Sequence, residues 1–162
     1  MAAIWSLRSA MLAGVCAAIM AGASSPARAG PAEDAAAIQS MLDQGEPADA
    51  EPVARAALAR AEGEMGGQSA EAANLHRLLG DTLFDQKKYA DAEPHFRQAL
   101  AIRAKILGPD HLDTARSAGD LAANLRAAGK PADAEPYYRQ ALAIRVTALG
   151  SDNVESVRSL WR

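Results

Sequence analysis

The chain has 162 residues, a formal net charge of −3 and one cysteine, and 4% of its residues are aromatic. The length suits a single domain. The mild negative charge is spread along the sequence and argues against a nucleic-acid partner, because such a partner favours a basic stripe on the protein surface.

The segment 1–29 is predicted to be a secretory signal peptide. Arg8 precedes an apolar run over residues 10–21, and Ala27-Arg28-Ala29 offers a signal-peptidase cleavage site. The apolar run is shorter than the roughly twenty residues that a permanent transmembrane helix needs. Cleavage would remove two arginines, change the net charge from −3 to −5 and leave no cysteine. We therefore expect an exported protein, periplasmic or secreted, with no membrane span after cleavage and no disulfide bond.

Two other interpretations of this segment remain open. The apolar run could be retained as a membrane anchor. Cys16 could be a lipoprotein acceptor, although Val15 precedes it where such sites carry a small residue. Both alternatives concern the leader alone and leave the expected fold of the following residues unchanged.

A repeat of fixed length organises the rest of the chain. The sequence DAEP occupies residues 49–52, 91–94 and 133–136, so the copies recur with a 42-residue period and without an insertion. A fixed period of this size indicates a repeat architecture that buries its core by stacking the units. Within a repeat domain of residues 30–162, the predicted units are 31–72, 73–114 and 115–156, with a partial helix of a fourth unit over 154–162.

Each unit is predicted to contain two helices. In the third unit, apolar residues recur at helical spacing over 115–128 and over 131–149, and a glycine follows each segment as a helix stop. Pro94 and Pro136 are expected in the first turn of the second helices, where a missing N–H group matters least. If those helices begin earlier, the prolines should bend them. The expected fold class is all-α.

Two successive units carry apolar, small and aromatic residues at matching positions. They are Leu79, Gly80, Leu83, Tyr89, Ala92, Phe96 and Ala99 in the second unit, and Leu121, Ala122, Leu125, Ala134, Tyr138 and Ala141 in the third. This pattern resembles the tetratricopeptide repeat, in the longer form found in kinesin light chains and many bacterial proteins. The resemblance implies a right-handed superhelical solenoid of antiparallel helix pairs, with about three repeats and a partial fourth. The first unit is degenerate, with Ala54 where the later units have Phe96 and Tyr138, which is typical of a terminal repeat.

No catalytic or cofactor chemistry is predicted. His76, His95 and His111 occupy unrelated positions of the repeat, and none of their spacings would bring metal ligands together on one helix. Acidic pairs recur with the repeat and are interpreted as helix-start charges. The sequence after the predicted leader has no cysteine nucleophile and no Gly-x-Ser-x-Gly turn. We therefore expect neither an enzyme nor a bound metal or cofactor.

The remaining candidate for function is a binding surface. In the family that the chain resembles, the first helix of each repeat lines a concave wall that binds an extended peptide or a partner helix. The resemblance therefore implies a scaffold that holds another protein. The mixed charges at the inward-facing positions suggest a polar peptide. These positions are Asn74, Arg77, Asp81, Asp85, Arg116, Asp120, Arg126 and Arg158.

A second hypothesis concerns the last residues of the sequence. Arg162 falls inside the first helix of a fourth unit, so the chain could be a fragment of a longer repeat protein. It could instead be a subunit that associates with a copy of itself through an open edge. Such an edge would leave apolar surface exposed to water. Each Å² left unburied would forgo about 25 cal/mol of stabilisation. The predicted edge residues are Val154, Val157, Leu160 and Trp161.

Overall fold

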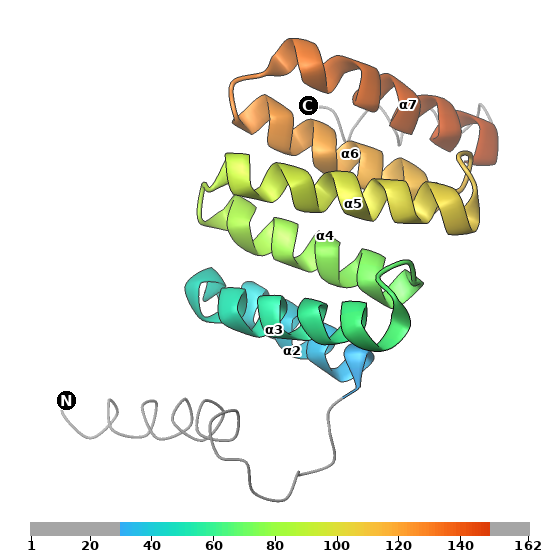
Figure 1. Ribbon diagram of the computed structural model, residues 1–162. Helices are drawn as coiled ribbons and strands as arrows, with labels where there is room; N and C mark the ends of the chain where they lie inside the picture. Colours follow the sequence, from blue (N-terminus) through green and yellow to red (C-terminus); the bar gives the residue numbers. More distant parts are fainter. Residues whose placement is uncertain (1–29, 150–162) are drawn as a thin grey trace, which may run out of the picture.

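The computed structural model describes residues 30–149, which form six α-helices and no strand. The helices are α2 (Pro31–Asp43), α3 (Pro47–Met65), α4 (Ala70–Asp85), α5 (Tyr89–Leu107), α6 (Leu112–Ala127) and α7 (Pro131–Leu149). They stack as antiparallel pairs, α2 with α3, α4 with α5 and α6 with α7, and each pair packs on the next (Figure 1). The all-α class predicted from the sequence is confirmed. None of these helices has the length and apolar character needed to cross a membrane.

The helices follow the 42-residue period of the sequence. Helices α4 and α6 begin at Ala70 and Leu112, and α5 and α7 begin at equally spaced positions in their units. The helix pairs of the second and third units therefore begin slightly before the predicted limits, 73 and 115. By contrast, α7 has the bounds that the sequence predicted for the last helix, 131–149.

Capping explains why the two first helices start earlier than the apolar pattern. The side-chain oxygen of Ser69 accepts a hydrogen bond from the backbone N–H of Ala72 (3.0 Å). His111 caps α6 in the same way, because its Nδ1 accepts from the N–H of Asp113 (3.1 Å). Such caps satisfy N–H groups that have no partner within the helix. The first two residues of each of these helices are exposed, so the apolar period does not show where the helix starts.

The repeated prolines lie deeper in their helices than expected. Pro94 and Pro136 are the sixth residues of α5 and α7, and Pro52 is the sixth residue of α3. The prediction that they occupy the first turn is therefore wrong. Each proline removes one hydrogen bond to the carbonyl four residues earlier. For Pro94 that carbonyl belongs to Ala90, an exposed residue, so water can replace the missing donor.

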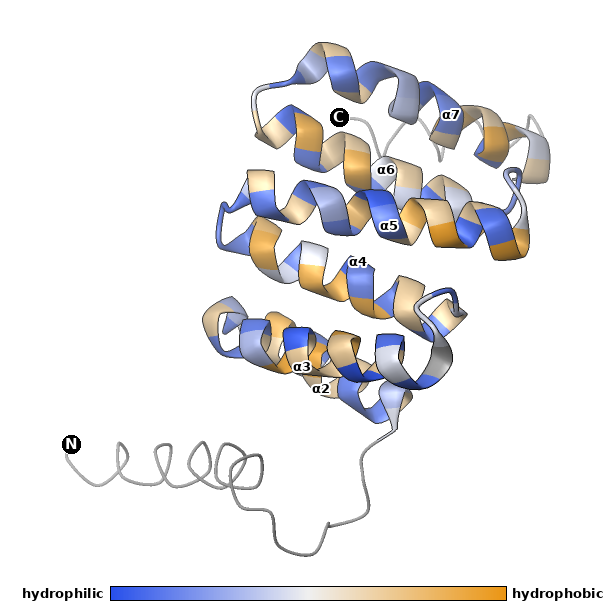
Figure 2. Cartoon of the chain, in the orientation of Figure 1, coloured by the Kyte–Doolittle hydropathy of each residue, from blue (hydrophilic) through white to orange (hydrophobic). Residues whose placement is uncertain are grey.

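The core is continuous along the stack. One cluster of buried side chains joins all six helices, with Ile38 on α2, Leu58 on α3, Leu79 on α4, Phe96 on α5 and Leu125 on α6 as members, and Ala134 contributed by α7. A smaller cluster joins α6 to α7. Each helix also carries hydrophilic residues, shown in blue in Figure 2. These two-sided helices bury their apolar side only by packing on a neighbour, so stacking the pairs makes one core.

Gly80 on α4 lies directly against the ring of Phe96 on α5. A Cβ atom built on Gly80 would lie 2.8 Å from a carbon of the Phe96 ring. Phe96 is 3% exposed, so the ring has little freedom to move away. The glycine therefore allows a large ring to fill the space between the two helices of one pair.

Candidate partner-binding surface

The structure places most of the predicted partner-binding residues on two first helices. Asn74, Arg77, Asp81 and Asp85 lie on α4, and Arg116, Asp120 and Arg126 lie on α6. Arg158 lies outside the described residues. So do the four predicted edge residues, Val154, Val157, Leu160 and Trp161.

Arg77 and Asp81 form an ion pair one turn apart on α4. The arginine also lies 3.5 Å from the side-chain oxygen of Asn74, to which it donates a hydrogen bond. Only 11% of the Arg77 side chain is exposed, and Asp81 is half-buried. This pair therefore differs from an ion pair on the solvent-exposed surface, which contributes little to the stability of a protein. Its charges are held in place by the packing around them.

Asp81 also interacts with charges on α6. Burial raises the pKa of the Asp81 carboxyl from 3.8 to about 6. The positive charges of Arg77 and Arg116 act against this rise in the pKa, whereas the negative charges of Asp120 and Asp85 add to it. Burial likewise raises the pKa of Asp120, against the effect of Arg116 and Arg77. The four residues Arg77, Asp81, Arg116 and Asp120 are called the charged cluster below.

Two further arginines reach the charged cluster from second helices. Arg103 on α5 donates a hydrogen bond to the hydroxyl of Ser117 on α6 (2.7 Å), and burial lowers its pKa. Arg145 on α7 lies close to Gly119 on α6: a Cβ atom built on that glycine would be 3.7 Å from a guanidinium nitrogen of Arg145. Both arginines act on the pKa of Asp120. Sequence reasoning missed them because it considered first helices only, although the two arginines are one repeat period apart and so mark one repeat position.

The charged cluster contains polar atoms whose hydrogen-bonding capacity is unused. Within residues 30–149, the Nε of Arg77 and one carboxylate oxygen of Asp120 are buried and have no hydrogen-bond partner. An unmade bond of this kind is unfavourable, and more so for a charged group.

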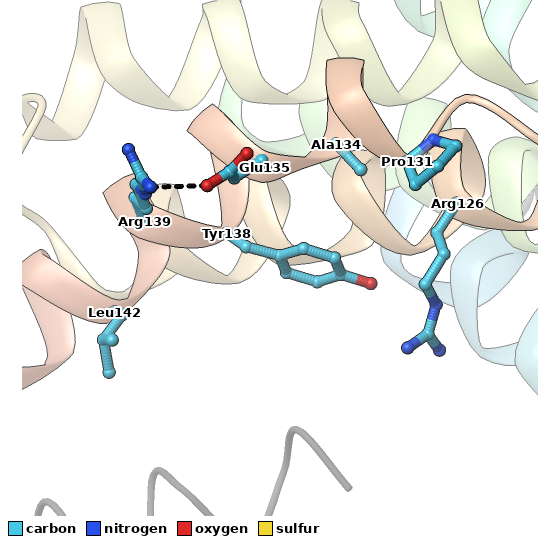
Figure 3. A pocket seen from close by; sticks show the side chains of 7 residues that line it. All are labelled: Arg126, Pro131, Ala134, Glu135, Tyr138, Arg139 and Leu142. Atoms are coloured by element: carbon cyan, nitrogen blue, oxygen red, sulfur yellow. Dashed lines mark ion pairs between the residues drawn. The ribbon is translucent and has the colours of Figure 1, made fainter.

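Arg126 lies apart from the charged cluster. Its guanidinium carbon is 6.0 Å from the centre of the Tyr138 ring on α7. Together these residues line a hollow of about 350 Å³ on α7, with Arg126 of α6 at its edge and Ala134 and Leu142 among the other lining residues (Figure 3). Arg126 was predicted to bind a partner together with Arg116, and the structure places it beside this hollow.

His76 and His95 face each other in the structure. Their Nδ1 atoms are 3.2 Å apart, and the Nε2 of His76 is 3.5 Å from a carboxylate oxygen of Glu62 on α3. The spacing of the two histidines does not indicate this contact, because they belong to different helices. Glu62 approaches the other ring nitrogen of His76 and not the space between the rings. Among residues 30–149 there is no group of three or more side chains placed to hold a metal ion.

The histidine pair predicts a pH dependence of stability. Burial lowers the pKa of both residues below 6.5, and the charge of His76 lowers that of His95 further. A lowered pKa in the folded state favours folding above 6.5, and this contribution is lost as the pH falls through the folded-state pKa. We therefore expect urea denaturation curves of the His95→Gln variant to show less loss of stability than wild type between about pH 7.5 and pH 5.5.

His111→Asn is the matched control for this measurement. It replaces the exposed histidine that caps α6 with another capping residue. A protonated Nδ1 cannot accept the capping hydrogen bond, so this variant measures how much of the wild-type pH dependence comes from the cap and not from the buried pair. If His95→Gln and wild type lose the same free energy of unfolding over this range, the buried pair is not the cause.

Comparison with known proteins agrees with this architecture. The family model of the tetratricopeptide repeat matches residues 37–105 and 71–145. BtubC (BKLC) from P. vanneervenii has a similar structure, with a TM-score of 0.67 and 24% identity over 74% of this chain and 48% of that one. The TPR domain of Arabidopsis FLU gives a TM-score of 0.63 and 23% identity over 72% of this chain and 95% of that domain.

A third similar structure is a putative kinesin light chain from Podosopora anserina with nearly identical TPR-like repeats. It has a TM-score of 0.67 and 19% identity, and the match covers 73% of this chain and 56% of that one. This chain thus spans about half the length of BtubC. No curated protein matches it. At these identities the similar structures show the fold, a solenoid of antiparallel helix pairs, and the matched family model covers most of the sequence. The chain belongs to the tetratricopeptide repeat family.

Proposed function

We propose that the protein is a non-enzymatic adaptor of the cell envelope, which binds a polar peptide segment of a partner protein at the charged cluster on α4 and α6. Membership of the tetratricopeptide repeat family supports the coarser part of this function, a scaffold for protein–protein interaction. The leader over residues 1–29 supports the location, since it has the composition of a secretory signal.

The observation that carries the proposed site is the set of charges that packing holds in place on α4 and α6. Arg77 and Asp81 form a mostly buried ion pair, and Asp81 also interacts with Arg116 and Asp120. Arg116 is the exposed member of this cluster, so its positive charge is open to a partner. Charges held in place give specificity, because a partner with the wrong charge meets repulsion there. The partner segment should therefore carry an acidic side chain that meets Arg116.

Selection from displayed random peptides tests this function with the chain of residues 30–162. The enriched peptides should carry acidic residues, and Arg116→Glu should weaken their binding about tenfold or more, because attraction becomes repulsion. Arg55→Glu is the control, since it makes the same charge change at an exposed site on α3, away from both α6 and α7. Peptides that bind Arg116→Glu as tightly as wild type would exclude this surface.

Mass spectrometry of the exported protein tests the proposed location. Cleavage after Ala29 would give an N-terminus at Gly30.

A further inference from the structure

The second helices of all three units present one equivalent face. On α5 this face consists of Ala92, Phe96 and Leu100, which share one core cluster with Leu121 and Leu125 of α6. Helix α5 packs on α6, while the Phe96 ring also lies against Gly80 of α4. Helix α3 receives α4 in the corresponding way. Two interfaces within the chain therefore show what this face binds: an amphipathic helix with apolar residues one turn apart.

An ion pair accompanies each of these interfaces. Lys88, in the loop after α4, donates to a carboxylate oxygen of Glu51 on α3 (2.9 Å), and Lys130, after α6, donates to Glu93 on α5 (3.0 Å). The two lysines are one repeat period apart, and so are the two glutamates. Both glutamate side chains are only 18% exposed. The hydrogen bond from Lys88 is the main cause that lowers the pKa of Glu51 to about 2. The lysine that follows α4 or α6 in the sequence is thus part of the interface that the helix makes with the preceding unit.

Helix α7 carries the same face, and the described residues bury its Ala134 but leave Leu142 and Glu135 exposed. Ala134, Tyr138 and Leu142 stand at the positions of Ala92, Phe96 and Leu100, and they line the hollow of about 350 Å³ (Figure 3). Leu142 is 38% exposed. Glu135, the counterpart of Glu51 and Glu93, is 58% exposed and pairs only with Arg139 of its own helix among residues 30–149.

We propose that this face of α7, with Arg126 at its border, binds an amphipathic helix of another protein that has the pattern of α6. The pattern is a leucine, a second leucine four residues later and a lysine five residues after that, as in Leu121, Leu125 and Lys130. The leucines enter the hollow over Ala134 and Tyr138, and the lysine pairs with Glu135. This site lies on a different surface from the charged cluster and goes beyond the function proposed there.

Two alternative occupants fit the face less well. Residues 154–162 align with 112–120, whose buried alanines, Ala115 and Ala118, cluster with Leu100 and not with Ala92 or Phe96. A folded second copy cannot offer its own α6, because Leu121 and Leu125 are fully buried within their chain.

The probe is a labelled synthetic peptide of residues 112–131 of this chain, added to the chain of residues 30–162. Fluorescence anisotropy should show saturable binding, and Glu135→Lys should weaken it about tenfold or more. A peptide carrying Lys130→Glu should bind wild type equally weakly and regain affinity for Glu135→Lys. Glu71→Lys is the control for the charge change, because Glu71 is exposed on α4 and away from α7. It should bind the unchanged peptide like wild type.

Several results would overturn the proposal. Binding that is insensitive to Glu135→Lys would mean that the peptide replaces α6 on α5. A peptide that does not bind, together with a Leu142→Ser variant that is clearly less stable, would mean that residues 150–162 cover the face. Sedimentation that shows a dimer dissociated by Leu142→Ser would mean that a second copy covers it. None of these results bears on the peptides that are selected for binding near Arg116. The proposal for the face of α7 and the proposal for the charged cluster are therefore tested separately.

Discussion

Phe96→Ala should lower the free energy of unfolding by about 3–5 kcal/mol, as expected for removal of a buried aromatic ring that leaves a cavity. The ring is 3% exposed and shares one core cluster with Leu79 of α4 and Leu121 of α6. It therefore joins the two helices of one pair to the next pair. A domain of this size is stable by about 5–15 kcal/mol, so the variant should unfold at a much lower urea concentration.

Tyr138→Ala is the matched control, because Tyr138 occupies the same repeat position one unit later. It is half-buried, at the border of the open hollow on α7. Its removal should cost clearly less, about 1–2 kcal/mol, since less area returns to water and the site is already open. Equal losses for the two variants would contradict the view that residues 30–149 cover the face of α5 but not that of α7.

The architecture could be predicted from the sequence because the residues that recur with the 42-residue period are those that face the core. The period placed α7 at its observed bounds, and the small residue Gly80 lies where a helix must approach a ring. The helix starts were less predictable. Ser69 and His111 act through hydrogen bonds to the backbone, which the apolar period does not contain.

For the candidate site, the sequence could predict which helix carries each residue but not how deeply its side chain is buried. A repeat register assigns Arg77 and Asp120 to first helices, but a charged residue in a sequence gives no sign that its side chain is buried. Arg103 could have been found from its spacing to Arg145. The approach of His76 to His95 joins two helices at unrelated repeat positions, and only packing in three dimensions brings them together.

Arg77→Met should destabilise the protein by about 2–4 kcal/mol near pH 7.5, because removing one partner of a mostly buried pair leaves the other charge uncompensated. Asp81 would then lie near Asp85 and Asp120 without its nearest positive charge. Methionine keeps most of the length and the apolar stem of arginine, so lost packing contributes little. Urea denaturation of wild type and variant measures the difference.

The pH dependence of this loss identifies its cause. The pKa of Asp81, raised from 3.8 to about 6, means that its protonation favours the folded state at low pH, a contribution that disappears as the pH rises through 6. Arg77 opposes the rise, so its removal raises this pKa further and makes the variant most unstable above about pH 6. At about pH 5, where the carboxyl of Asp81 is protonated, much of the loss should be recovered.

A double-mutant cycle with Asp81→Asn isolates the interaction between the two charges. The asparagine carries no charge at any pH, so Arg77→Met should cost less in that background and should lose its dependence on the state of Asp81. If the cost of Arg77→Met is the same at pH 5 and 7.5 and in both backgrounds, the stem of the arginine matters and its charge does not. In that case the charged cluster would owe its order to packing alone, and a partner peptide would have no fixed charge to recognise on α4.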